Sequence, residues 1–373
     1  MTTIVKAAGA AEFLGLVPHT LGFTPHESVV VIPFSGARTL GSIRFDIPPE
    51  SDVDATSATM IGMVCRLDSA DALAAVIYTE SRCAGAGLPR RELAQGILKR
   101  ADASGLRVVD ALCVAADGWG SYLDEQCPRD GRTLAALGQV PGVSELPEVH
   151  GDQWSGAELP AVDQVRAKLT ARALSEVQRV FQMLHPDSWL ESCDHDTDCD
   201  TEAEPAMRDT LRAIQDPPAL FEEALDWAEI TPERAAALIW CFDKPALRDV
   251  ALVQWASNRA FGDQALQEQL LWTAGQPYPD ELGARFAGRG PRPVLRRLTS
   301  GLALTREAAA LAPRNSQPGL LSACAWLSWA LGRSTHAERY GATAHAIDPH
   351  HGLAAIVRTY AAAGHLPDWV WNT

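Results

Sequence analysis

A turn-rich segment that follows an apolar run carries side chains able to hold a ligand. Residues 117–122 (DGWGSY) supply the Asp117 carboxylate, the Ser121 hydroxyl and the rings of Trp119 and Tyr122. In α/β sheets ligands gather at the carboxyl ends of strands, where exposed aromatic rings suit a binding site. Alternatively, the two aromatic residues close the core and only their polar ends reach solvent. Ser121 does not stand in a Gly-x-Ser-x-Gly elbow, which argues against a hydrolase nucleophile.

A glycine-rich turn occupies the position of a phosphate-binding loop. Gly85 and Gly87 follow one predicted strand, and Arg90 and Arg91 stand at the start of the next predicted helix. A dinucleotide fingerprint would need glycine at position 90, and a Walker loop would need Gly-Lys-Ser/Thr, so neither motif is present. If a phosphate binds, we expect these four residues to bind it. The alternative is an ordinary flexible turn between a strand and a helix.

Alternating aspartates in an acidic segment resemble a cation-binding pattern only in part. Asp194, Asp196, Asp198 and Asp200 have the spacing of a calcium loop, but Cys199 and Pro205 replace its glycine and glutamate. Whether this segment binds a cation stays open beside the interpretation as a solvated acidic loop. The eight cysteines form no C-x-x-C pair, so we predict no metal site and no cofactor. His26 and Glu27 flank the start of the first predicted strand, where a lone histidine is more often structural than catalytic.

The first part of the chain predicts an α/β domain, whose strands and helices would position these residues. Short apolar runs rich in valine and isoleucine indicate buried strands, and longer segments with apolar residues three or four apart indicate helices. Residues 41–47 alternate apolar and polar side chains, which predicts a strand paired with the first one and places Arg44 and Asp46 on its wet face. The predicted strands cover residues 27–34, 41–47, 72–79 and 106–114, and the predicted helices cover residues 52–67 and 89–103. The sheet is therefore expected to be mixed.

The second part of the chain reads as mainly helical. Prolines and glycines punctuate residues 139–160, where we expect the crossing between the two parts. A long helix over residues 162–184 has an apolar stripe of Val165, Leu169, Ala173, Val177, Val180 and Leu184. Residues 285–293 (RFAGRGPRP) predict a flexible break. The predicted domains are an α/β domain over residues 1–140, a linker with the long helix and the acidic loop over 141–205, and a helical domain over 206–373.

The end of the chain has a repeat-like pattern. Predicted helices over residues 320–331, 335–347 and 353–363 are separated by Gly332 and by Asp348-Pro349. Small residues recur where these helices would pack closely, which resembles tetratricopeptide-type hairpins. An ordinary helical subdomain is the alternative, because only about one and a half units are visible and a solenoid needs about three.

Composition excludes several classes of protein. The 373 residues are 47% hydrophobic and 21% charged, which is typical of a globular chain, and the formal net charge is −15. An acidic surface repels phosphate backbones, so a nucleic-acid partner is not expected. Neither a signal peptide nor an apolar run of about 18 residues stands out, so we expect no membrane association and a cytoplasmic location with reduced cysteines.

Three separated motifs occur in a recognisable order along the chain. Residues 21–34 (LGFTPHESVVVIPF), followed by residues 44–48 (RFDIP), resemble the opening of an uncharacterised actinobacterial family, domain of unknown function 4192. The turn at residues 117–122 looks like its Trp-Ser-Tyr hallmark, with Gly120 inserted, and the hairpins near Gly332 are also similar. Relatives often have several cysteines after this turn, whereas only Cys127 follows here. The resemblance implies no activity.

Two hypotheses follow. The first is a non-enzymatic binding or scaffold protein, whose helical half presents a surface to a protein partner and whose α/β half binds a ligand. The second is an enzyme that acts on a small anionic or nucleotide-like substrate at the strand ends. Its site would use Arg44, Asp46, Asp117, Ser121 and Tyr122, and we expect replacement of Trp119 to impair binding more than folding.

Overall fold

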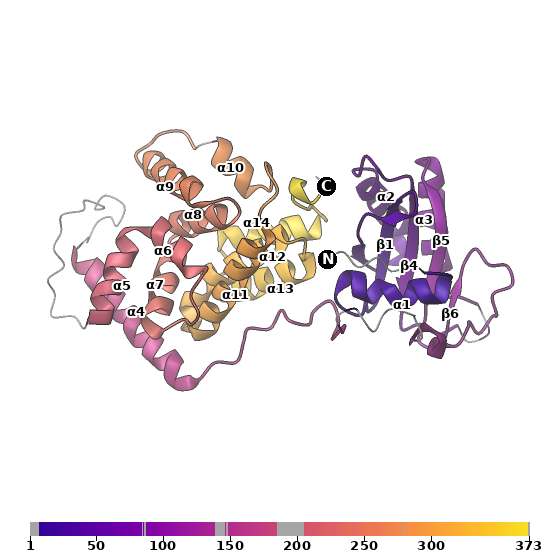
Figure 1. Ribbon diagram of the computed structural model, residues 1–373, viewed down its shortest axis with the longest axis horizontal. Coiled ribbons are helices and arrows are strands. Elements are labelled where there is room, and N and C mark those ends of the chain that lie inside the picture. The colour runs from indigo at the N-terminus through magenta and orange to yellow at the C-terminus, as the bar shows by residue number, and fades with distance from the viewer. Residues whose placement is uncertain are drawn as a thin grey trace. The chain divides into compact units, whose positions relative to one another are not determined.

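The computed structural model describes residues 7–83, 85, 87–138, 146, 148–184, 205–278 and 280–371. The chain forms two compact units, Met1–Ser155 and Gly156–Thr373 (Figure 1). The predicted acidic loop, with Asp194, Asp196, Asp198, Asp200 and Cys199, lies outside the described residues. Within the described part, none of the helices combines the length and the apolar character that crossing a membrane requires.

The first unit is built on one mixed sheet, as the sequence predicts. Its strands are β1 (Ser28–Ser35), β2 (Arg38–Thr39), β3 (Ile43–Asp46), β4 (Ala72–Tyr78), β5 (Arg107–Val114) and β6 (Trp119–Ser121). The sheet order is β2-β1-β4-β5-β6, and β3 pairs with β1 beside β2. Only β4 and β5 are parallel, and the other pairs are antiparallel. The short strand β6 lies in the segment that the sequence pattern indicated only as turn-rich.

Pro33 lies within β1, at a place where the missing N–H costs no hydrogen bond. Its carbonyl oxygen accepts a hydrogen bond from the N–H of Leu40 at 2.8 Å. Both backbone groups of a strand residue in an antiparallel pair point to the same side, so the proline nitrogen also faces the β2–β3 edge. The pairing of β1 along that edge is interrupted between Val31 and Phe34, which accommodates the proline.

Helices cover both faces of this sheet. The helical elements are α1 (Ala10–Leu21), η1 (Glu50–Asp52), α2 (Val53–Val64), α3 (Arg91–Ala103) and η2 (Leu134–Gly138). On one face α2 and α3 pack on Val29, Val31 and Ile77. On the other face α1 and η2 pack on residues such as Val30 and Leu112 (Figure 1). Helix α1, which the sequence analysis did not predict, therefore completes a three-layer arrangement.

The second unit consists of helices in the described residues. They are α4 (Gln164–Leu184), α5 (Pro205–Gln215), α6 (Pro217–Ala224), α7 (Pro232–Phe242), α8 (Pro245–Trp255), α9 (Arg259–Thr273), α10 (Asp280–Phe286), α11 (Leu295–Leu311), η4 (Arg314–Ser316), α12 (Gln317–Ala330), α13 (Ser334–Ile347), α14 (Gly352–Ala362) and η5 (Asp368–Val370). Their shared core contains fully buried tryptophans, among them Trp255, Trp326 and Trp329. The mainly helical second half is confirmed.

The apolar stripe predicted for α4 is buried only in its second part. Ala173, Val177 and Val180 are buried, whereas Val165 and Leu169 are 61% and 48% exposed. Helix α4 packs on α7, which has 11 residues against 21 in α4. A helix of half the length cannot cover the whole stripe by itself, because each residue adds about 1.5 Å to a helix, and the further contacts of α4 with α5 and α11 leave Val165 and Leu169 exposed. Spacing alone predicted the face but not the length of the contact.

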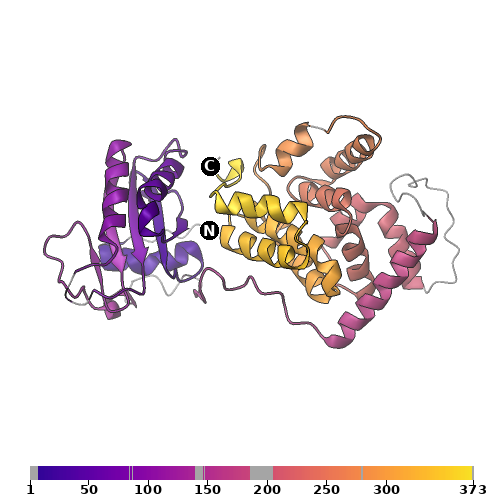
Figure 2. The same ribbon diagram turned by 180° about the vertical axis from the view of Figure 1, so that it is seen from behind.

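Helices α12, α13 and α14 form two consecutive antiparallel hairpins near the chain end, as predicted (Figure 2). The small residues expected at close helix contacts, Ala337, Ala344 and Ala354, are all 0% exposed. Gly332, with a φ of 77°, provides the left-handed residue after α12. The hairpins are thus present, while their relation to tetratricopeptide repeats remains a prediction.

Candidate functional site

Several segments of the α/β unit converge at one end of its sheet, called the sheet end below. Strands β4 and β5 both finish there, because they are parallel and joined through α3, and the antiparallel β1 begins there. In the register Ser28 lies beside Tyr78, and the N–H of Thr79 donates to the carbonyl of Val114 at 3.0 Å. The residues just before β1 and just after β4 and β5 are therefore neighbours, together with the start of α3.

Glu27 and Arg90 occupy this end in strained backbone conformations. Among the described residues they are the two non-glycine residues with positive φ, at 40° and 58°. Glu27 Oε2 lies 3.6 Å from Arg90 Nη2, and Glu27 Oε1 accepts a hydrogen bond of 2.8 Å from the Thr79 hydroxyl. Such conformations cost about 1–3 kcal/mol each and cluster at sites of function. The pair therefore marks the sheet end as the candidate site.

His26 adds a second titratable pair beside the first. Its Nε2 lies 2.7 Å from Glu80 Oε1, and its Nδ1 is buried without a hydrogen-bond partner. The buried side chain of Gln153 fixes the His26 backbone, accepting from its N–H at 3.0 Å and donating to its carbonyl at 2.8 Å. The Trp154 ring lies 5.8 Å from the imidazole. An imidazole oriented by a carboxylate is an arrangement that general acid–base catalysis uses.

The start of α3 brings together the four residues predicted to bind phosphate. Gly85 and Gly87 have φ of 74° and 92° in the turn after β4, while Ala86 lies outside the described residues. Arg90 is the N-cap residue of α3, and its side chain makes no capping hydrogen bond. Exposed Arg91 follows, with its guanidinium 5.9 Å from the centre of the Tyr122 ring. Two arginines thus lie at a helix N-terminus that lacks a side-chain cap, with Glu92 in the first turn and Glu27 facing Arg90.

Arg44 and Asp46 lie on the edge strand β3, and Arg44 contacts the segment before β1 through Ser28. The Arg44 Nε donates to the Ser28 hydroxyl at 2.8 Å, and that hydroxyl donates to the His26 carbonyl at 2.6 Å. Arg44 also pairs with Asp46. The Arg44 side chain is only 10% exposed, so it supports the segment before β1 from behind.

Asp117 ties the turn after β5 to the segment after β4. Its carboxylate accepts hydrogen bonds from the N–H of Cys83 at 2.8 Å and from the Nε of Arg82 at 3.2 Å. The Cys83 N–H, together with the Arg82 guanidinium, holds the pKa of Asp117 below its usual value. The predicted ligand residue Asp117 is thus an ionised side chain that links two segments of the sheet end.

The other residues of the predicted DGWGSY site are dispersed between the two faces of the sheet. Trp119 is 6% exposed in the core beneath α1, and its Nε1 donates to the Thr133 carbonyl at 3.1 Å. Ser121 is 8% exposed and donates to Asp110 Oδ1. Tyr122 packs on the α3 side, and its hydroxyl donates to the Pro89 carbonyl. Their polar atoms bind protein groups, which favours the core-closing interpretation.

Sequence reasoning missed the centre of the sheet end. It interpreted His26 as structural, gave Glu27 no role and did not single out Thr79 or Glu80. The available signal was the pair His26-Glu27 directly before a valine-rich strand, whose start must lie beside the ends of parallel strands. The positive φ of Glu27 could not be inferred from the sequence, because glutamate does not favour this conformation. Within the part of the chain that the structure describes, no group of three His, Cys, Asp or Glu residues is arranged to hold a metal ion.

Comparison with known proteins identifies a family without an assigned activity. The sequence model described as Domain of unknown function (DUF4192) matches residues 11–368, which include both units. Searches among curated proteins and among solved structures gave no match. Because the match extends over more than half of the chain, the protein belongs to the family of domain of unknown function 4192.

Proposed function

We propose that this is a cytoplasmic binding protein whose α/β unit holds a small anionic ligand at the sheet end and whose helical unit offers a surface to a protein partner. The Glu27–Arg90 pair carries the proposal, because two strained residues of opposite charge face each other beside a helix N-terminus. The cytoplasm suits the cysteines, since the six that the structure describes are unpaired.

Arg90 is suited to exchange its partner for an anion. The 3.6 Å distance to Glu27 is long for an ion pair, and the Nε of Arg90 is buried without a hydrogen-bond acceptor. A phosphate or carboxylate could accept from this guanidinium, from Arg91 and from the first-turn N–H groups of α3 at once. The strain at Arg90 then serves to hold the guanidinium in place before the ligand arrives.

Titration of the full chain with inorganic phosphate and with a nucleoside monophosphate tests this proposal. Isothermal calorimetry should detect binding to the wild type, and Arg90→Gln should weaken it by about tenfold or more, as expected for a charged hydrogen bond. Arg100→Gln, on the last turn of the same helix, removes the same charge and should leave the affinity unchanged. Equal losses in the two variants, or no binding by the wild type, would reject the anion site.

An enzyme that acts on a small anionic substrate remains the second candidate, and the His26–Glu80 pair favours it. A carboxylate 2.7 Å from Nε2 can orient the imidazole, while Nδ1 has no hydrogen-bond partner among the described residues. The test is turnover of para-nitrophenyl phosphate, and of any ligand found by calorimetry, followed by NMR. An enzyme should lose turnover but not binding on His26→Asn. Substrate that remains intact with the wild type would favour the binding protein.

Exposed aromatic residues support the protein-binding part of the proposal. Trp272 at the end of α9 and Tyr278 after it are 50% and 40% exposed, and their ring centres lie 5.7 Å apart. Leu271 beside them is 56% exposed. Tryptophan and tyrosine are enriched among residues that dominate protein interfaces. A Trp272→Ala variant, compared with the wild type by crosslinking and mass spectrometry, should lose crosslinks to the partner while keeping its fold.

A further inference from the structure

A segment of the helical unit concentrates positive charge in an acidic protein. Residues 282–306 contain six arginines and no Asp, Glu or Lys, although the whole chain has a formal net charge of −15. The segment includes the connection between α10 and α11 and the first turn of α11. Its exposed arginines and large apolar residues between α10 and the first turn of α11 are Arg289, Arg292, Val294, Leu295 and Arg296, which we call the basic loop.

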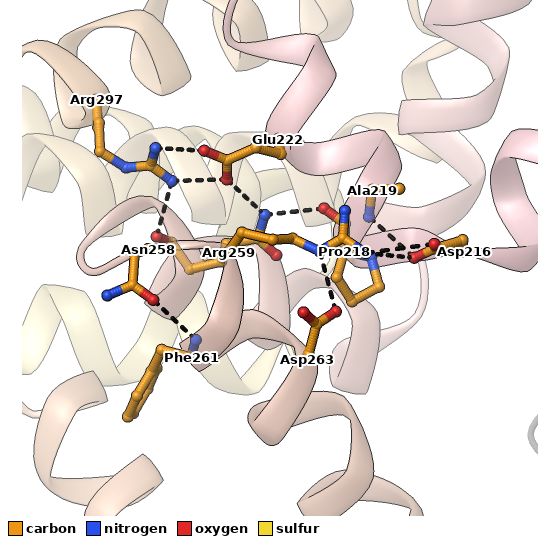
Figure 3. Close-up of polar contacts among 10 residues, drawn as sticks. Asp216, Pro218, Ala219, Glu222, Asn258, Arg259, Phe261, Asp263 and Arg297 are labelled. Atoms are coloured by element: carbon orange, nitrogen blue, oxygen red, sulfur yellow. Dashed lines mark hydrogen bonds and ion pairs between the residues drawn. The ribbon is translucent and has the colours of Figure 1, made fainter.

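Three of the six arginines are committed to internal contacts. Arg297 donates through Nη1 and Nη2 to the two carboxylate oxygens of Glu222, at 2.6 and 2.8 Å (Figure 3). Arg285 donates to the Pro291 carbonyl at 2.6 Å, and Arg306 donates to the Glu158 carbonyl. These three side chains are therefore engaged within the helical unit.

The other three arginines are exposed and have no ion-pair partner among the described residues. They are Arg289, Arg292 and Arg296. Two apolar side chains stand among them, Val294 at 60% and Leu295 at 52% exposure. Three cations without ion-pair partners lie beside two exposed apolar side chains in an otherwise acidic protein. Such a surface is complementary to a partner that carries negative charges and apolar side chains.

The backbone just before the basic loop, within the break expected from the sequence, is hydrogen-bonded to the core of the helical unit. Trp326 Nε1 donates to the Phe286 carbonyl at 2.9 Å, and the Asp368 N–H donates to the Gly288 carbonyl at 2.9 Å. Gly288 has a φ of 81°, and a Cβ there would lie 2.7 Å from the buried Trp329 ring. A loop anchored in this way loses little conformational entropy when it binds.

We propose that the basic loop docks an acidic segment of a partner protein, one that carries apolar side chains between its Asp and Glu residues. The arginines pair with the carboxylates while Val294 and Leu295 cover the apolar side chains. A nucleic acid fits less well, because a phosphate backbone offers nothing to the apolar pair and the rest of the chain repels a polyanion. Polybasic sites on anionic membranes use about four to eight cations, against three here.

This inference deepens the protein-binding part of the proposed function and rests on it, but not on the anion site of the α/β unit. Fluorescence polarisation of the full chain with labelled peptides tests it. The probe alternates Glu with Leu, one comparison peptide replaces Glu by Gln, another replaces Leu by Gly, and a single-stranded oligonucleotide carries equal charge. The triple variant R289Q/R292Q/R296Q is compared with K168Q/R172Q/R179Q, which removes three exposed cations from α4.

The Glu-Leu peptide should bind the wild type more tightly than the three other probes. The loop variant should lose about tenfold or more in affinity, as three screened charge contacts predict, and the α4 variant should lose less than about twofold. Leu295→Ser should weaken the Glu-Leu peptide but not the Glu-Gly peptide. The proposal is overturned if no peptide binding is detected at about 1 mM, if both triple variants lose affinity equally, or if the oligonucleotide binds more tightly than the Glu-Leu peptide. It is also overturned if the wild type self-associates in sedimentation and only the loop variant loses this self-association, because the loop would then bind a second copy of the chain.

Failure of this test would leave the anion site and the aromatic surface of Trp272 and Tyr278 untouched, because each has its own variant and probe. Conversely, loss of partner crosslinks in Trp272→Ala with unchanged peptide binding would place a second contact outside the basic loop. Thermal unfolding monitored by circular dichroism should be unchanged in both triple variants, since all six replaced side chains are exposed.

Discussion

Arg90 Nη2 and Glu27 Oε2 face each other at 3.6 Å across the sheet end, and both residues have left-handed backbone conformations. One comes from the first residue before β1 and the other from the N-cap of α3, 63 positions later in the sequence numbering. A side chain with a Cβ pays about 1–2 kcal/mol for a left-handed backbone. The pairing of two such residues indicates that their positions matter more than the stability that they cost.

The strain at Arg90 predicts an inverted order of stability for two substitutions. Arg90→Gly should be more stable than Arg90→Ala by about 1 kcal/mol, because glycine adopts a φ of 58° without a Cβ penalty. At Arg100, within α3, glycine should be less stable than alanine by about 1 kcal/mol. Urea unfolding of the four variants measures both differences. The same order at both positions would contradict the strain at Arg90.

Gly262 on α9 is expected to tolerate no side chain. A Cβ there would lie 2.0 Å from the Oε1 of Gln254, a 0% exposed residue whose Nε2 donates to Pro218 and Glu222. Gly262→Ala should therefore lower the free energy of unfolding by about 1–3 kcal/mol through overpacking. Gly352→Ala, where no atom lies within 4 Å of the new Cβ, should be neutral or stabilising. Denaturant titration followed by circular dichroism separates the two cases.

His351 should make the helical unit less stable in mild acid. Burial, with a contribution from Arg248, lowers the pKa of His351, although Asp348 and Asp243 act in the opposite direction. Its Nδ1 accepts from the Ala354 N–H at the start of α14. The unfolded chain, with a histidine pKa of about 6.5, then takes up the proton first. Stability contributed by neutral His351 is complete above about pH 6.5 and is lost as the pH falls toward the lowered pKa.

An asparagine at position 351 keeps a capping acceptor but does not titrate. His351→Asn should therefore reduce the slope of unfolding free energy against pH between about 7 and 5, measured by urea unfolding at several pH values. His350→Asn, at the exposed neighbour, should retain the wild-type slope. A slope that is the same in all three proteins would exclude His351 as its source.

Trp119 is expected to act on folding rather than on ligand binding. It is 6% exposed beneath α1, so removal of its ring should cost about 3–5 kcal/mol. Trp154, at 39% exposure, should cost much less when replaced by alanine. Thermal unfolding of Trp119→Ala and Trp154→Ala compares the two. A loss of anion binding in Trp119→Ala at unchanged stability would restore the interpretation as a ligand-binding residue.

The sequence by itself determined which segments form the sheet and most of the helices. Valine-rich runs predicted β1, β4 and β5, and the small residues Ala337, Ala344 and Ala354 predicted close helix contacts, because burial requires apolar side chains at the period of the element. This periodicity rule failed where the structure depends on contacts with distant parts of the chain. It missed α1 and β6, and it predicted burial for Val165 and Leu169, which depends on the length of the helix opposite.

Only the tertiary structure decided where the chemistry can occur. The sequence brought attention to residues 117–122, but its pattern predicted no strand there. The alternation that puts Trp119 and Tyr122 on opposite sides of the sheet became evident only with β6 in place. Glu27 meets Arg90 because β1 is antiparallel to β4 and α3 begins beside its start. Likewise, six arginines are visible in residues 282–306, but which three remain unpaired depends on acceptors such as Glu222, brought near by packing of distant helices.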